Sequence, residues 1–173
     1  KAAGVIADKA VTIAMEGRPG PVHIDVPISV AEEDALEKGV LRRPSVTVAP
    51  TGEECDAPRA ALVAAKRPVA AVGLDAMTEG AEYAVRPVAD LGIPVVTTYK
   101  AKGMLPESHS NALGGAWLSP KADKVLLPLL RDADVILCIG YDPIEMRDGW
   151  TDPWDPAKQD VIDITAEPNH HYM

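Results

Sequence analysis

The sequence has little cysteine, no long uncharged apolar run and a shortage of basic residues, and each shortage excludes a class of protein. Two cysteines in 173 residues are too few for a disulfide scaffold, and 13 glycines without a period of three exclude a collagen-like chain. The apolar runs are far shorter than the roughly 20 residues that a membrane helix needs. The net charge of −9 argues against a partner with a nucleic-acid backbone.

The remaining composition, 47% hydrophobic and 25% charged, is typical of a soluble globular protein. The length suits one domain, or one domain with a piece of another. The chain begins with Lys1 inside an alanine-rich helical pattern and stops at Met173, just after a strand-like run. We therefore expect a piece of a longer polypeptide. No signal-peptide pattern is visible, and we expect a cytoplasmic protein.

The first fifty residues follow a different pattern from the rest. Apolar residues three and four apart predict a helix over residues 2–16, which Gly17 ends. Residues 21–26 alternate apolar and polar side chains and predict a strand. Residues 28–50 are rich in acids and prolines and predict a linker between two domains.

From residue 51 onward, helical patterns alternate with short continuous apolar runs. Such runs predict parallel strands that are covered on both faces. We therefore predict an α/β fold with a Rossmann-like open parallel sheet and helices on both faces. The sequence assigns no regular element to residues 98–119. The predicted strands are residues 69–73, 93–97, 135–139 and 161–165, and the predicted helices are near 53–65, 79–91 and 120–132.

Ligands of open parallel sheets bind outside the carboxyl ends of the strands, so residues there are candidates for a nucleotide site. Glycine lets backbone approach a phosphate, lysine meets phosphate as a point charge, and an aspartate can accept from a ribose hydroxyl. The candidate residues are Gly73, Lys100, Lys102, Gly114, Gly140 and Asp163. We expect a bulky residue at position 140 to abolish binding at modest cost in stability. An alternative remains open: these glycines are ordinary turn residues, and the lysines belong to a solvated loop.

The sequence shows no catalytic constellation and no metal site. Residues 73–77 depart from the Gly-x-Gly-x-x-Gly fingerprint, and no Cys/His cluster has ligand spacing. Cys138 lies in an apolar run and is predicted to be a core residue. Trp150 and Trp154 are predicted to pack a loop against the domain rather than to stack on a ligand ring. We therefore assign no catalytic residue and no metal ligand.

Several segments, in matching order and spacing, resemble enzymes of the thiamine diphosphate-dependent family of the acetolactate synthase type. The similar segments are residues 17–27, 67–73, 92–98, 102–109, 133–145 and 161–164. The resemblance implies a three-domain enzyme. Residues 1–27 would be the C-terminal tail of its pyrimidine-binding domain, residues 28–50 a linker, and residues 51–173 a central domain truncated at its C-terminus.

The resemblance also implies the chemistry of the parent enzyme. That enzyme would decarboxylate a small 2-oxo acid and join the product to a second carbonyl compound, as a homo-oligomer. Thiamine diphosphate and magnesium would be bound mostly outside this chain, where the family's catalytic glutamate also lies, so the chain alone would be inactive. Alternatively, the chain is a non-catalytic regulatory module that binds FAD or ADP, or a structural domain for oligomer contacts.

The resemblance leaves three possibilities for the crevice of the central domain: FAD, ADP or nothing. Flavin-binding members carry a Gly-x-Arg-x-Asp-x-Arg type segment after a late strand, and only Gly140 and Arg147 match it here. The sequence of residues 141–145 is more similar to that of catabolic acetolactate synthases, which lack flavin.

Overall fold

The computed structural model describes seven parts of the chain and divides the chain into two compact units, Lys1–Val48 and Ala49–Met173. The described residues are 3–15, 20–34, 49–77, 82–117, 119–145, 150 and 152–166. None of the helices in these ranges is long and apolar enough to cross a bilayer. Most of the predicted linker, residues 35–48, lies outside the described residues, as does Arg147.

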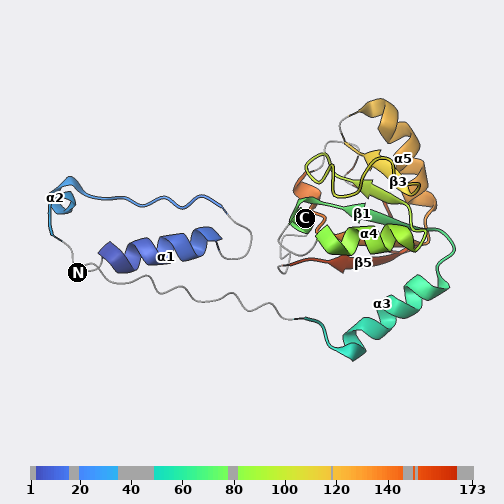
Figure 1. Cartoon of the computed structure of the whole chain (residues 1–173), viewed down its shortest axis with the longest axis horizontal. Helices are drawn as coiled ribbons and strands as arrows, with labels where there is room; N and C mark the ends of the chain where they lie inside the picture. The colour runs from blue at the N-terminus through green and yellow to red at the C-terminus, as the bar shows by residue number, and fades with distance from the viewer. Residues whose placement is uncertain are drawn as a thin grey trace. The chain divides into compact units, whose positions relative to one another are not determined.

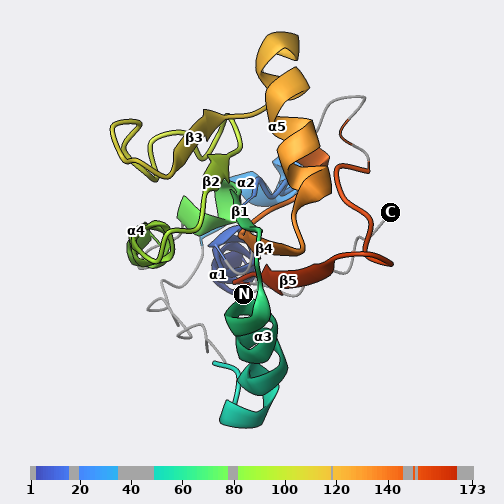
Figure 2. The same ribbon diagram turned by 90° about the vertical axis from the view of Figure 1, so that its right-hand side faces the viewer.

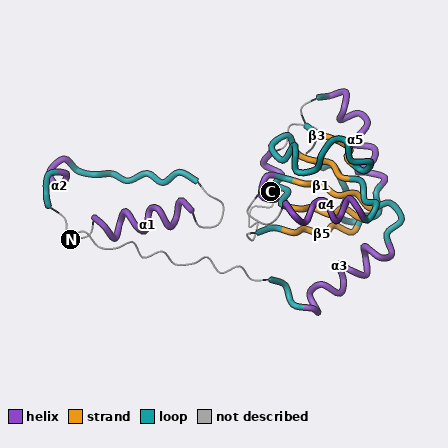
Figure 3. The backbone as a smooth tube through the Cα atoms, viewed as in Figure 1, coloured by secondary structure: helices purple, strands orange, loops and turns teal. Residues whose placement is uncertain are grey.

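The first unit contains α1 (Ala3–Met15) and the single turn α2 (Ile28–Ala31). The helix predicted over residues 2–16 is confirmed. The strand predicted over residues 21–26 is wrong, because these residues run without regular secondary structure (Figure 3). A strand is held by hydrogen bonds to a neighbouring strand, and residues 3–15 and 20–34 include none. The alternating side chains of residues 22, 24 and 26 are accordingly exposed.

The second unit is built on a five-stranded sheet in which every neighbouring pair is parallel, in the order β3-β2-β1-β4-β5 (Figure 1). The predicted parallel α/β fold is confirmed. The strands are β1 (Pro68–Val72), β2 (Val95–Thr97), β3 (Ala112–Gly115), β4 (Val135–Ile139) and β5 (Asp160–Ile164). The sequence did not indicate β3, which lies in the stretch that was assigned no element.

Helices cover both faces of the sheet, as predicted (Figure 2). On one face α5 (Pro120–Asp132) packs against alternate residues of β1 and β4, through a core that includes Leu126 and Leu130. On the other face α4 (Glu82–Asp90) packs Val85 and Ala89 against the remaining residues of β1 and β4, which point toward that face. Every residue of β4 is buried, which explains its unbroken apolar sequence. The predicted core position of Cys138 is confirmed, and burial raises the pKa of its thiol.

The helix α3 (Gly52–Ala64) precedes β1 and begins with a capping box. The backbone N–H of Thr51 donates to the Glu54 carboxylate at 2.6 Å. This bond is the main cause that holds the pKa of Glu54 below its usual value. No residue of α3 is buried, although Leu62 packs against the core on the α4 face. The helix therefore leads into the sheet but adds little to its core.

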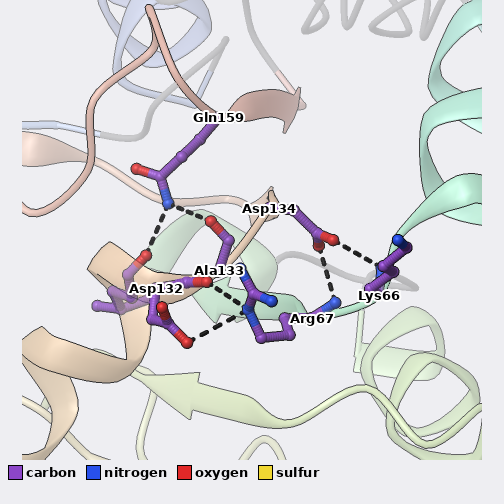
Figure 4. Close-up of polar contacts among 7 residues, drawn as sticks. Lys66, Arg67, Asp132, Ala133, Asp134 and Gln159 are labelled. Atoms are coloured by element: carbon purple, nitrogen blue, oxygen red, sulfur yellow. Dashed lines mark hydrogen bonds and ion pairs between the residues drawn. The ribbon is translucent and has the colours of Figure 1, made fainter.

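The amino ends of β1 and β4 are joined by Asp134 (Figure 4). Its carboxylate accepts the backbone N–H groups of Lys66 at 2.7 Å and Arg67 at 2.9 Å. Desolvation is the largest influence on its pKa and acts upward, but the N–H bonds and Arg67 together outweigh it and lower that pKa. Arg67 also donates from Nε to the carbonyl oxygen of Asp132 at 2.7 Å. These contacts fix the register of β1 and β4 at the amino ends of the two strands.

We expect that deletion of residues 1–27 leaves the second unit folded. All core residues of both apolar clusters lie between Val69 and Trp150, so the deletion removes none of them. The far-ultraviolet circular dichroism melting temperature of the shortened chain should stay within about 4 °C of the intact chain, equivalent to roughly 1 kcal/mol. A much larger fall would show that residues 1–27 are part of the same folding unit.

Candidate functional site

The point where the sheet reverses its strand order lies between β1 and β4. From β1 the chain passes to β2 on one side, and from β4 it passes to β5 on the other. In open α/β sheets a ligand crevice forms at this switch point, outside the carboxyl ends of the two strands. Gly73 follows β1 and Gly140 follows β4, so two of the predicted residues lie at the switch point.

The two glycines are in direct backbone contact. The Gly73 N–H donates to Ile139 O at 2.9 Å, and the Asp75 N–H donates to Gly140 O at 3.1 Å. A Cβ atom on Gly73 would lie 2.5 Å from the Cα of Tyr141 and closer still to the carbonyl oxygen of Gly140. The loops after β1 and β4 therefore close upon each other, and this packing requires glycine at position 73.

Gly140 is constrained more strongly than the sequence suggests. Its φ is +58°, in the left-handed region that favours glycine. A Cβ atom there would overlap the backbone nitrogen of Ala76 and lie 2.6 Å from the carbonyl carbon of Asp75. The expectation of a modest stability cost for a bulky residue at position 140 is wrong, because the side chain would enter backbone rather than an open groove.

Glu145 closes the same crevice from the loop after β4. It ends the short helix η2 (Pro143–Glu145), and its Oε1 accepts the backbone N–H of Leu74 at 3.1 Å. Leu74 begins η1 (Leu74–Met77), the turn that follows Gly73. The Glu145 side chain is only 7% exposed. The sequence assigned no role to Glu145, and this contact was not predicted.

An aromatic cluster lies beneath the loops after β3 and β4. The ring centroids of Trp117 and Trp150 are 4.5 Å apart, and those of Tyr141 and Trp154 are 5.1 Å apart. The predicted packing role of Trp150 and Trp154 is confirmed, since both rings join the apolar core on the face of the sheet that α5 covers. Burial is the main cause that raises the pKa of the Tyr141 phenol. Trp117 holds a φ of 75°, which is uncommon for a side chain of its size.

Two other candidates meet at the β2–β3 end of the sheet. Lys102 and Gly114 line a small pocket of about 10 Å³, which has room for about one water molecule. The ammonium group of Lys102 pairs with the carboxylate of Glu107 at 2.9 Å. The structure therefore shows Lys102 beside Gly114, with its charge already partnered.

The last two candidates lie further apart. Lys100 follows β2, is exposed, and places its ammonium group 5.8 Å from the ring centre of Tyr99. Asp163 lies on β5, opposite Cys138 in the register of the sheet. The six predicted residues thus share the carboxyl edge of one sheet. Among them, Gly73 and Gly140 are in contact, and Lys102 and Gly114 line one pocket.

The thiamine cofactor that the resemblance implies does not fit the described residues. A magnesium-bound diphosphate needs several oxygen ligands that converge on one ion. The described parts of the chain hold no group of three or more His, Cys, Asp or Glu side chains that could bind a metal. These residues therefore offer no magnesium–diphosphate site.

Comparison with known proteins decides the family. A family model described as "Thiamine pyrophosphate enzyme, central domain" matches residues 56–171. The chain belongs to this family. Its described fold is similar to part of a solved structure named as "a putative thiamin diphosphate-dependent enzyme" from Mycobacterium smegmatis. That structure aligns with a TM-score of 0.66 at 23% identity, over 96% of this chain and 32% of the other.

Several curated relatives of this central domain are acetolactate synthases. A probable acetolactate synthase large subunit of Methanococcus aeolicus is 35% identical over 142 residues, which are 76% of this chain and 23% of the relative. The acetolactate synthase isozyme 3 large subunit of Escherichia coli is 32% identical, over 78% of the chain and 24% of the relative. The mouse 2-hydroxyacyl-CoA lyase 1 is 30% identical, over 78% and 22%. The chain thus spans under a quarter of the length of these relatives.

Proposed function

We propose that this central domain belongs to an acetolactate synthase-like enzyme that decarboxylates a 2-oxo acid and joins the product to a second carbonyl compound. The observation that carries the proposal is the family match over residues 56–171, together with acetolactate synthase relatives at 32–35% identity. The enzyme would be a cytoplasmic homo-oligomer. Residues 1–27 would be the tail of its pyrimidine-binding domain, residues 28–50 a linker, and residues 51–173 its central domain.

The reaction would be carried by groups outside this chain. Thiamine diphosphate supplies the carbanion chemistry when it is bound with magnesium, and the protein supplies binding and orientation. In this proposal the parallel sheet is a rigid support between the two domains that hold the cofactor. Its described side chains neither activate the cofactor nor hold the metal.

The alternative proposal is a structural or regulatory domain without chemistry of its own, and the described residues, which form no group that could bind a metal, agree with either proposal. The flanking sequence separates the two possibilities. A downstream Gly-Asp-Gly motif followed by an asparagine, the family's magnesium–diphosphate signature, would favour the enzyme.

Activity on pyruvate tests the proposed reaction. We expect the full-length polypeptide to form acetolactate and release carbon dioxide when thiamine diphosphate and magnesium are present. We expect the 173-residue chain alone to show no turnover, because it carries neither the family's catalytic glutamate nor its magnesium–diphosphate motif. The full-length polypeptide without thiamine diphosphate is the control. Turnover by the isolated chain, or none by the full-length polypeptide with any 2-oxo acid tested, would contradict the proposal.

A further inference from the structure

The loop after β1 has no backbone donor left for a phosphate at residues 73–76, and the first of these donors, the Gly73 N–H, is bonded to Ile139 O at 2.9 Å. In nucleotide-binding sheets the N–H groups at this place point toward the diphosphate of the ligand. Here Asp75 donates to Gly140 O at 3.1 Å and Ala76 donates to Gly73 O at 3.1 Å. The Leu74 N–H, which follows that of Gly73, donates to the Glu145 carboxylate at 3.1 Å.

Glu145 is held in place to make this contact. Its own backbone N–H donates to Asp142 O at 3.1 Å, which closes the turn after β4. Its side chain is more than nine-tenths buried. One carboxylate oxygen takes the Leu74 N–H, and the other has no hydrogen-bond partner among the described residues. A carboxylate accepts N–H donors as a phosphate oxygen does, so the loop already has an anion bound to it.

Like charges would oppose a second anion at the same place. Two charges a few ångströms apart interact more strongly in a partly desolvated site than in water. A diphosphate at the switch point would lie against Glu145 and close to Asp142, which is also buried. It would also have to separate the backbone contact between Gly73 and Gly140.

We infer that the Glu145 carboxylate is an internal anion that latches the loop after β1 to the loop after β4 and closes the switch point to a dinucleotide. The central domain of this protein therefore works without FAD or ADP in that crevice. The inference rests on contacts within residues 73–145 and is independent of the reaction proposed above.

Amide hydrogen exchange of the 173-residue chain tests the latch. We expect the Leu74 amide to be protected, and Glu145→Ala to speed its exchange about tenfold, as expected when a charge-assisted hydrogen bond is lost. Glu145→Gln keeps an acceptor oxygen without the charge and should give an intermediate rate. Glu107→Ala, which removes an exposed carboxylate paired with Lys102, is the control and should leave Leu74 unchanged. An unprotected Leu74, or equal exchange in the wild type and both Glu145 variants, would overturn the latch.

Nucleotide titration tests the closure. We expect FAD and ADP, at up to about 1 mM, to cause no saturable chemical-shift change at the amides of residues 73–76. The full-length polypeptide should be isolated without the visible absorbance of flavin and should not gain it on incubation with FAD. Saturable shifts at residues 73–76, or stoichiometric flavin in the full-length polypeptide, would overturn the inference even if the latch exists.

Discussion

Replacement of Gly140 by alanine is expected to lower the free energy of unfolding by about 3 kcal/mol, the sum of a left-handed backbone penalty and of overpacking. The residue holds a φ of +58°, and an added Cβ would overlap Ala76 N. The loop after β1 would have to move away from the loop after β4. Urea denaturation followed by circular dichroism measures the loss.

Gly115→Ala is the matched control for this substitution. Gly115 also lies at the end of a strand, but its nearest non-neighbouring atoms would be Lys102 Cδ at 3.8 Å and Thr97 Oγ1 at 3.9 Å. These are ordinary contacts, and we expect a change within about 1 kcal/mol. If Gly140→Ala were as stable as Gly115→Ala, the two loops at the switch point would not be in backbone contact.

Replacement of Gln159 by alanine is expected to lower the free energy of unfolding by about 2–4 kcal/mol, because it removes three hydrogen bonds to backbone groups. The side-chain amide donates to Leu130 O at 2.8 Å and to Ala133 O at 2.7 Å, at the C-terminal end of α5. Its Oε1 accepts the Asp155 N–H at 2.7 Å. The side chain, shown in Figure 4, is only 8% exposed, so water cannot replace these bonds.

Gln159→Glu and Lys158→Ala complete this series. The glutamate keeps an acceptor for the Asp155 N–H but places a carboxylate against two carbonyl oxygens, so its loss should be at least as large. Lys158 forms an exposed ion pair with Asp155 at 2.7 Å, and its removal should have little effect. A Gln159→Ala protein with the denaturation midpoint of the wild type would refute the role of Gln159 as a cap of α5.

The central strands could be predicted because burial on both faces leaves a direct signal in the sequence. All five residues of β4 are buried, and its run from Val135 to Ile139 contains no polar residue that would obscure the pattern. The short edge strand β3 could not be predicted, since Ala112–Gly115 contains two glycines and its register with β2 is irregular. The strand predicted over residues 21–26 failed because strand pairing depends on a neighbour that no local pattern reveals.

The candidate site was predicted in part. The rule that ligands bind at strand ends indicated Gly73 and Gly140, and both lie at the switch point. Their mutual contact joins residues far apart in the chain, and the sequence gives no measure of the distance between two loops. The bond from Leu74 to Glu145 likewise spans 71 positions. A glutamate among other scattered carboxylates carries no spacing signal, so its role became visible only in the folded chain.

Calorimetric titration with thiamine diphosphate and magnesium tests most directly the claim that this chain is the central domain of a thiamine diphosphate-dependent enzyme and leaves the cofactor to other domains. The full-length polypeptide is predicted to bind thiamine diphosphate saturably, and to lose this binding when magnesium is chelated. The 173-residue chain is predicted to show no saturable heat at any ligand concentration up to about 1 mM. Saturable binding to the isolated chain, or no binding to the full-length polypeptide, would contradict the account.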